Sequence, residues 1–384
     1  MTSHSSADFA AREEIERAFA EGLKNRTFSG AVLLIGTADR ILFHRCWGTT
    51  QWGGSPVDKA TRFDLASLTK PLVTALLCAV AVERRWFTLD DVLGSFFAHD
   101  LVPSDKQSIT VRQLLAHCSG LPAYLPFYRE LIRQPFVARE LELLSRILRT
   151  PLLASPGTTT VYSDLGFVVL GAILQSVLQG PLDQLAQQFI FQPLAISELE
   201  FLPFAPSSDP TLPPDLPQRQ DFHFAATELC PWRRRLLLGE VHDENAYCLG
   251  GVAAHSGLFG TAAGVYQLLA HLLAAYQKQS ASPLVSSDLL ETIWRRQEID
   301  GHSTWALGFD TPSAVNSTAG RFFSAGSVGH LGFTGTSFWM DLEQDVIVVL
   351  LTNRVHPTRH NESLREFRPL VHNLAMKAYY ESCK

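Results

Sequence analysis

A serine and a lysine three residues apart are the first feature of this sequence that could do chemistry. Lys70 is one of seven lysines in 384 residues, and it alone has a serine, Ser67, three positions before it. The apolar run over residues 71–82 predicts a buried helix, and Pro71 fits only its first turn. We therefore expect the helix to begin close to Ser67, with hydroxyl and amine on one face. This is the geometry of a serine nucleophile with a lysine base.

The amine of Lys70 can accept a proton only where it is uncharged. Free lysine has a pKa near ~10.4, and lowering it to about 7 requires roughly 4.6 kcal/mol of destabilisation of the cation. A helix N-terminus supplies only ~0.3–1 kcal/mol, so burial or a neighbouring cation must supply the rest. An isolated S-x-x-K is more often a capping serine followed by a solvated lysine, so the assignment needs further motifs.

Two later segments could supply those motifs. Tyr162 and Asp164 lie at the start of another apolar run, although on their own they fit a core aromatic and a helix N-cap. His330 follows one glycine and precedes Gly332 by two positions, at what we expect to be the start of a strand. Glycine at such a position allows the backbone to approach a ligand closely.

Taken in this order, the three segments resemble the serine β-lactamase and penicillin-binding-protein superfamily. The closer likeness is to the branch of class C β-lactamases, D-alanyl-D-alanine carboxypeptidases and family VIII esterases. The S-x-x-K, Y-x-N and K/H-x-G elements of that family correspond to Ser67 with Lys70, Tyr162 with Asp164, and His330 with Gly332. The likeness extends from about residue 25 to 375 and includes the text at residues 110–122, 239–246, 250–259 and 352–359.

The resemblance implies an α+β fold of the β-lactamase/transpeptidase type, in which an antiparallel sheet flanked by helices lies beside a mainly helical half. Residues 1–85 and 255–384 would form the sheet half and residues 86–254 the helical half of one catalytic unit. Strand patterns near both chain ends, with helical patterns between them, agree with this layout. The proline-rich residues 203–217 predict an irregular surface excursion.

Hydrophobic periodicity predicts the individual elements. The expected helices cover residues 8–24, 111–116, 136–148, 165–178, 182–191, 262–277, 287–296 and 364–380. The expected strands cover residues 30–36, 41–47, 337–341 and 345–352.

The resemblance also implies roles for single residues. Ser67 would attack an ester or amide carbonyl, while Lys70 and Tyr162 would share the proton transfer with pKa values that belong to the pair. A nearby ammonium would stabilise the tyrosinate form of Tyr162. The backbone N–H groups of Ser67 and Phe333 would form the oxyanion hole. The expected substrate-binding residues are Asp164, His330, Gly332 and Arg354.

Two positions depart from the family pattern. Asp164 replaces an amide that can donate a hydrogen bond, whereas an ionised carboxylate only accepts. Its charge near Lys70 would also favour the ammonium form. His330 stands where the family can have a lysine, and since imidazole has a pKa near ~6.5, a fixed cation for a substrate carboxylate is not assured. Arg354 or Arg359 could supply that contact. Both departures argue against efficient β-lactam turnover but leave acyl transfer by Ser67 intact.

Composition restricts the remaining possibilities. A net charge of −6 without long charge runs gives no footprint for nucleic acid. No metal-binding motif occurs, and we expect neither a metal nor another cofactor. The six cysteines lack C-x-x-C spacing and are expected to be free thiols. No apolar run approaches the length of a membrane span, and no signal peptide is visible, which favours a cytoplasmic protein. The oligomeric state has no sequence signal.

The favoured hypothesis is a cofactor-free serine hydrolase that works through an acyl-enzyme. Its substrate would be a short ester, a D-amino-acid peptide or muropeptide, or a β-lactam as a side activity. The alternative is a catalytically idle protein of the same fold that binds peptides or cell-wall fragments, but all three proposed catalytic side chains are present. An α/β-hydrolase would need a G-x-S-x-G motif, and none occurs.

Overall fold

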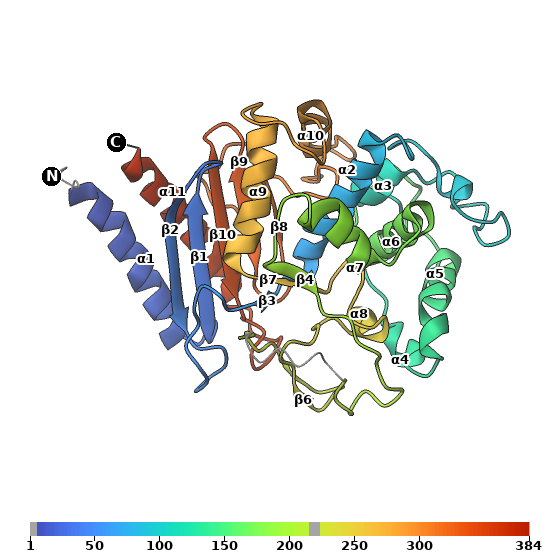
Figure 1. The fold of residues 1–384 in the computed structure, drawn as a ribbon, viewed down its shortest axis with the longest axis horizontal. Helices are drawn as coiled ribbons and strands as arrows, with labels where there is room; N and C mark the ends of the chain where they lie inside the picture. Colours follow the sequence, from blue (N-terminus) through green and yellow to red (C-terminus); the bar gives the residue numbers. More distant parts are fainter. Residues whose placement is uncertain (1–5, 215–222, 384) are drawn as a thin grey trace.

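A five-stranded antiparallel sheet forms the centre of the computed structural model, which describes residues 6–214 and 223–383. The strands are β1 Gly30–Gly36, β2 Ile41–Gly48, β8 Val328–Leu331, β9 Ser337–Asp341 and β10 Val346–Thr352. Their order is β2-β1-β10-β9-β8. Because β1 pairs with β10, with Ala31 opposite Thr352, the sheet joins the two ends of the chain (Figure 1).

Side chains of β1 alternate between two cores, as in a strand with helices on both faces. Leu33 packs in a cluster with residues of α1 (Ser6–Lys24) and α11 (Leu364–Ser382), which lie side by side on that face (Figure 1). Leu34 belongs to the larger core on the opposite face, where α9 (Ala262–Tyr276) covers the sheet. The larger core continues into the helical half of the molecule.

The helical half contains α3 Val111–Leu115, α4 Tyr128–Leu131, α5 Arg139–Arg149, α6 Asp164–Leu178, α7 Leu182–Ala186 and α8 Glu244–Cys248. A π-helical turn, Gln187–Phe191, continues α7, and α10 (Ser287–Trp294) packs on α9. Two 3₁₀ turns cover Leu93–Ser95 and Phe136–Ala138. Every helix expected from periodicity is therefore present, with ends shifted by a few residues.

Short strands join the two halves. β3 (Phe63–Asp64), β7 (Leu258–Gly260) and β4 (Leu199–Phe201) form a three-stranded sheet in the order β3-β7-β4. β5 (Leu229–Cys230) pairs with β6 (Arg235–Leu236). None of these strands was expected, because two or three residues show no measurable alternation. In the proline-rich stretch, residues 203–214 contain no helix or strand, and residues 215–217 lie outside the described part.

The helical run that carries Ser67 covers Ala66–Glu83 and has three parts. They are a 3₁₀ turn (Ala66–Leu68), a π-helical turn (Lys70–Ala75) and α2 (Leu76–Glu83). By length and composition alone this run could cross a membrane, contrary to the expectation that no run is long enough, because the helix extends beyond its apolar centre. In the protein, 83% of it is buried, as in a core helix.

Candidate active site

The backbone immediately before Ser67 is held in an uncommon conformation. Ala66 has a φ of +48°, in the left-handed region that side chains with a Cβ rarely adopt. Its N–H donates to Asp64 Oδ1 at 2.8 Å, and the other carboxylate oxygen of Asp64 accepts the N–H of His242 at 2.6 Å. This buried carboxylate therefore fixes the turn from which Ser67 projects into the cleft.

The amine of Lys70 lies on the same side of the helix as Ser67, as the spacing predicts. Lys70 Nζ is 3.1 Å from Ser67 Oγ and donates to the backbone carbonyl of His255 at 3.1 Å. It also forms an ion pair with Asp164 at 2.6 Å. The side chain of Lys70 is fully buried, so its three N–H groups are used inside the site.

The charge state of Lys70 differs from the uncharged amine expected of a lysine base. Burial acts to lower the pKa of Lys70, but the Asp164 carboxylate and the Tyr162 hydroxyl outweigh it and raise the pKa above its usual value. The amine is therefore an ammonium at neutral pH. This agrees with the prediction that the charge of Asp164 favours the ammonium form of Lys70.

Tyr162 completes the group around the nucleophile. Its hydroxyl lies close enough to the Lys70 amine and the Ser67 hydroxyl for both to influence its pKa, and its ring centroid lies 4.8 Å from Lys70 Nζ. Burial raises the pKa of Tyr162, and the Lys70 charge that opposes this shift is not sufficient to reverse it. The phenol of Tyr162 is consequently protonated and neutral before the reaction. This differs from the tyrosinate form that a nearby ammonium was expected to stabilise.

Asp164 is the first residue of α6 but does not cap it. Ser163 is the N-cap, and its hydroxyl accepts the N–H of Gly166 at 3.1 Å. The Ser163 N–H in turn donates to His117 Nδ1 at 3.0 Å. This leaves the Asp164 carboxylate free of backbone capping, so that one oxygen pairs with Lys70 while the side chain, 20% exposed, lines the cavity.

The strand segment after His330 is bound to the nucleophile segment by two threonines. Thr334 donates to the carbonyl of Asp64 at 2.7 Å, and Thr336 donates to that of Leu65 at 3.1 Å. Gly332 lies so near that a Cβ on it would be 1.9 Å from Thr336 Oγ1 and 2.7 Å from the Leu65 carbonyl. Glycine is thus required at this position, which brings Phe333 to the same cavity as Ser67.

His330 is the third of the four residues of β8, so it lies near the end of a strand and not at its start as expected. Its Nδ1 is 2.8 Å from the Leu331 carbonyl, which can only accept, so Nδ1 carries the proton. Burial and the charge of Lys70 lower the pKa of His330 to about 3. The imidazole is therefore neutral, and it cannot replace the family's lysine as a cation.

Two aromatic side chains that sequence reasoning did not assign to the site surround Tyr162. Trp305 stacks on the Tyr162 ring at 5.2 Å and lies 5.5 Å from the His330 ring. His117 lies 4.7 Å from Tyr162 and 4.5 Å from Trp305. No motif or spacing marks either residue, since they reach the site from loops distant in sequence.

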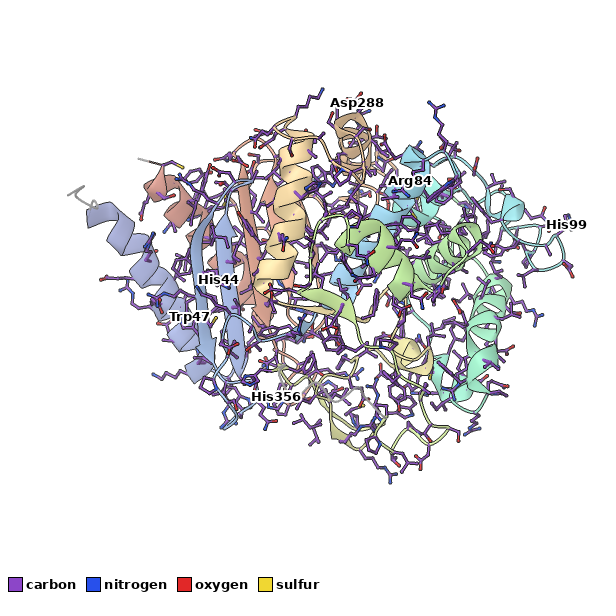
Figure 2. All side chains as sticks on the ribbon, in the orientation of Figure 1. His44, Trp47, Arg84, His99, Asp288 and His356 are labelled. Carbon is purple, nitrogen blue, oxygen red and sulfur yellow. The ribbon has the colours of Figure 1, made fainter. Side chains whose placement is uncertain are left out.

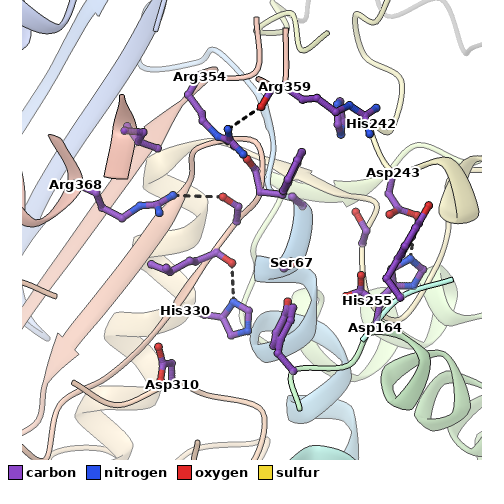
Figure 3. Close-up of a pocket in the computed structure, with 18 of the residues that line it drawn as sticks. Ser67, Asp164, His242, Asp243, His255, Asp310, His330, Arg354, Arg359 and Arg368 are labelled. Atoms are coloured by element: carbon purple, nitrogen blue, oxygen red, sulfur yellow. Dashed lines mark hydrogen bonds and ion pairs between the residues drawn. The ribbon is translucent and has the colours of Figure 1, made fainter. Parts of the chain in front are cut away.

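Arginines form the opposite wall of the cavity (Figure 3). Of the two arginines considered for a substrate carboxylate, Arg359 already pairs with Glu228 and Glu244, each at 2.6 Å. Arg354 instead donates to three backbone carbonyls, those of Phe333, Arg359 and Asn361, and lies over the Phe333 ring at 4.6 Å.

A second arginine of this wall comes from α11. Arg368 donates to the carbonyls of Gly332 and Thr336, while its buried Nε has no partner. Burial, together with the charge of Arg354, lowers the pKa of Arg368 to about 9. Among the described residues, neither Arg354 nor Arg368 has a carboxylate within ion-pair distance, so neither guanidinium forms a direct ion pair.

The cavity has a volume of about 630 Å³ and extends from this arginine wall to an acidic side (Figure 3). On that side, Asp243 accepts from His255 Nε2 at 3.0 Å and caps α8 through the Ala246 N–H at 2.7 Å. The spacing of these two residues states no chemical role, and the sequence favours loop-ordering or rim residues; in the structure they order the loop whose carbonyl binds Lys70. Within residues 6–214 and 223–383, no cluster of three or more potential metal ligands occurs.

A family model described as "Beta-lactamase" matches residues 15–372. The chain belongs to the β-lactamase family. Relatives of this β-lactamase-family protein include a "Putative D-alanyl-D-alanine carboxypeptidase" of Escherichia coli O157:H7, 28% identical over 359 residues, 86% of this chain and 79% of that protein. An "N-acetylmuramyl-L-alanine amidase" of Bacillus subtilis (strain 168) is 28% identical over 362 residues, 89% of this chain and 80% of that protein.

Solved structures show the same fold. EstCE1, described as a hydrolase with promiscuous acyltransferase activity, has a TM-score of 0.71 at 20% identity and covers 97% of this β-lactamase-family chain and 100% of its own. A penicillin-binding protein homologue from Pyrococcus abyssi has a TM-score of 0.70 at 19% identity, and the match covers 95% of this chain and 76% of that one. The family and the names of its relatives support a hydrolase, as the sequence motifs predict.

Proposed function

We propose that this protein is a serine hydrolase that cleaves an amide or ester through an acyl-enzyme on Ser67. The observation that supports this most directly is the convergence of Ser67, Lys70 and Tyr162 within hydrogen-bonding reach in one cavity. A nucleophile beside groups that can move its proton is the arrangement that covalent catalysis requires.

The charge states at rest constrain the proton transfer. The Lys70 ammonium cannot take the Ser67 proton until it has lost one of its own. Tyr162, whose hydroxyl lies near both groups, would relay a proton between them. The positive charge of Lys70 stabilises the alkoxide that forms, and the apparent pKa of the reaction belongs to the coupled pair. The same groups would return the proton to the leaving group and then activate water for deacylation.

The oxyanion of the tetrahedral intermediate would be bound by the backbone N–H groups of Ser67 and Phe333. Ser67 lies in the first turn of its helix, where backbone N–H groups point outward. Phe333 follows Gly332, which packs against the carbonyl before Ala66. Gly332 would thus set the distance between the two donors. Losing one such donor typically lowers the rate by ~10²–10³.

We propose that the substrate is a peptide or cell-wall fragment whose leaving side carries a carboxylate. The two relatives named above are described as a carboxypeptidase and as an amidase of muramyl-alanine bonds. Arg354, with Arg368 behind it, would provide the cationic contact that His330 does not. A guanidinium fork matches a carboxylate in shape and charge.

Intact-mass analysis and peptide mapping after exposure to a fluorophosphonate probe and to penicillin test this proposal. We expect a fluorophosphonate adduct on Ser67, none in Ser67→Ala, and an unchanged adduct in Ser256→Ala, which removes a neighbouring hydroxyl of the same cavity. A penicillin adduct on Ser67 would indicate a carboxypeptidase-like site, and labelling by the probe alone an esterase-like or amidase-like one. A folded protein that neither reagent labels would be the idle binding protein.

A further inference from the structure

Two side chains that line the cavity beside Ser67, His330 and Asp164, present hydrogen-bond acceptors. His330 Nε2 is buried and has no partner, and since Nδ1 carries the proton, Nε2 presents a lone pair. His330 lines the cavity together with Ser67 (Figure 3). An acceptor buried without a partner costs free energy, so a ligand that supplies the missing donor is favoured.

Asp164 presents a second acceptor. Its Oδ1 is buried against Lys70, so the exposed 20% of the side chain belongs to the remainder of the carboxylate, which lines the same cavity. An ionised carboxylate has about four lone-pair sites and donates nothing. A substrate carbonyl at this position would therefore meet another acceptor.

The cations of the cavity do not pair with the His330 lone pair. The Lys70 N–H groups are directed to Asp164, Ser67 and the His255 carbonyl, and its side chain is fully buried. The arginines of the cavity lie on the opposite wall (Figure 3), where Arg354 packs over the Phe333 ring. In the family pattern the position of Asp164 carries an amide, which can donate, and the position of His330 carries lysine or histidine. Asp164 and the neutral His330 thus replace possible donors on this side of the nucleophile with acceptors.

We propose that Asp164 and His330 select an acyl group that carries hydroxyl or amine N–H donors close to the scissile carbonyl, such as a 2-hydroxyacyl or 2-aminoacyl group. This rests on the proposed function and deepens it, since it defines the acyl side of the substrate. A donor at this position satisfies the orphan lone pair of His330 or the open oxygen of Asp164. An acyl group without one leaves both unpaired, and a polar site rejects such analogues strongly.

Three nitrophenyl esters test this selectivity: 2-hydroxypropanoate, 2-methylpropanoate with the same number of heavy atoms, and 2-methoxypropanoate with one more carbon. The methoxy ester keeps the electron-withdrawing oxygen but cannot donate, so it controls for intrinsic reactivity. Each kcat/KM is divided by the spontaneous hydrolysis rate of the same ester. We expect the hydroxy ester to exceed both others by about tenfold or more, the usual effect of one hydrogen bond left unmade in a polar site.

Variants assign the preference to residues, and the ratio of hydroxy to methoxy ester within one protein cancels general losses of activity. In His330→Leu, which lacks the acceptor, and in His330→Lys, which replaces it with a cationic donor, the ratio should fall toward one. Asp164→Asn should lower it by a smaller factor, because the amide keeps one acceptor. His99→Lys, on the outer loop of the helical half, should leave the ratio unchanged (Figure 2).

The outcomes separate this proposal from the proposed function. A ratio near one in the wild type, with Ser67 still labelled by the fluorophosphonate, overturns the selectivity and leaves the hydrolase standing. A ratio that survives in all three site variants overturns the assignment to Asp164 and His330. Loss of Ser67 labelling in the wild type contradicts the proposed function itself. Thermal melting of each variant identifies any that fails to fold, and the two His330 variants, one apolar and one charged, test the same group independently.

Discussion

One carboxylate changes the electrostatics of the site. Asp164 lies 2.6 Å from Lys70 Nζ, where the family pattern has a neutral amide. A neighbouring opposite charge stabilises the ammonium, which explains why the pKa of Lys70 is raised despite complete burial. A buried ion pair of this kind costs desolvation of both groups. The ion pair of Lys70 and Asp164 therefore keeps Lys70 charged, and it is not expected to stabilise the fold.

Replacing this carboxylate should move the pH dependence of the reaction. If the reaction requires loss of a proton from the coupled pair of Lys70 and Tyr162, kcat/KM rises with pH. The midpoint of this rising limb of the pH profile is the apparent pKa of the pair. Asp164→Asn removes the charge that raises the pKa of Lys70, so the limb should shift to lower pH and the rate at pH 7, relative to its plateau, should rise several-fold.

The pH profile of ester hydrolysis measures this shift. Asp288→Asn removes an equally charged but exposed carboxylate on α10 and should leave the limb in place (Figure 2). An unmoved limb in Asp164→Asn would show that Asp164 does not govern the proton transfer.

Arg354 should contribute to binding of substrates with a carboxylate on the leaving side. Arg354→Gln removes a guanidinium that has no carboxylate partner in the described residues. Its KM for such a substrate should rise about tenfold, since charged hydrogen bonds contribute roughly 1.5–3 kcal/mol. For a neutral ester the KM should change little. Steady-state kinetics with the two substrates distinguish these effects, and an equal change for both would argue for a merely structural role.

At the scale of elements, the site depends on how closely the β8–β9 connection packs on the nucleophile turn. Two threonine hydroxyls bond to the carbonyls of Asp64 and Leu65 across about 270 positions of sequence. The turn itself contains Ala66 at positive φ. Neither segment could hold its geometry alone, so the proposed oxyanion hole exists only where they meet.

Gly332→Ala should therefore displace Phe333 from the nucleophile. A Cβ at this position would overlap with Thr336 Oγ1 and approach the Leu65 carbonyl closely. We expect kcat to fall about 10²-fold, the typical effect of losing one oxyanion donor.

Gly326→Ala is the matched control, because the nearest atom to its added Cβ is 3.5 Å away. Comparison of kcat and melting temperature in both variants separates the two effects. Full activity in Gly332→Ala would contradict a role of this segment in catalysis.

At the scale of the whole molecule, the two chain ends form one side of the protein, and their contact with the sheet contains a buried histidine. His372 of α11 lies with Nδ1 2.7 Å from the Thr318 carbonyl and Nε2 3.2 Å from Ser337 Oγ of β9. Burial lowers the pKa of His372 to about 3. The folded protein therefore requires this imidazole to be neutral.

The stability of the protein should consequently fall in acid. An unfolded histidine has a pKa near ~6.5, so between that pH and about 3 the unfolded chain binds a proton that folded His372 does not. The contribution of neutral His372 is complete above ~6.5 and is lost as the pH falls toward about 3. In His372→Gln, the melting temperature should decline less steeply from pH 7 to pH 4.5.

Melting curves of the wild type, His372→Gln and the exposed variant His99→Gln over this pH range test the assignment. His99→Gln should retain the wild-type slope. An identical slope in all three proteins would mean that other groups cause the acid sensitivity.

The local elements and the family were determined by the sequence alone. Periodic patterns predicted the helices and four of the five strands of the central sheet, because 3.6- and 2-residue periods are visible over five or more positions. The range of β8, with four residues, was not predicted. The i, i+3 relation of Ser67 and Lys70 is a property of one helix. Tyr162, Asp164, His330 and Gly332 could be assigned because a resemblance to the family connected segments that are distant in the chain.

Only the tertiary structure decided the charge, polarity and partners of the site. Lys70 is an ammonium, Arg359 is occupied by two glutamates, and His117 and Trp305 enclose Tyr162. Each of these results depends on groups that approach within a few ångströms from loops far apart in sequence. Electrostatic interactions and desolvation depend on distance and burial in space, and the order of residues along the chain specifies neither until the fold has formed.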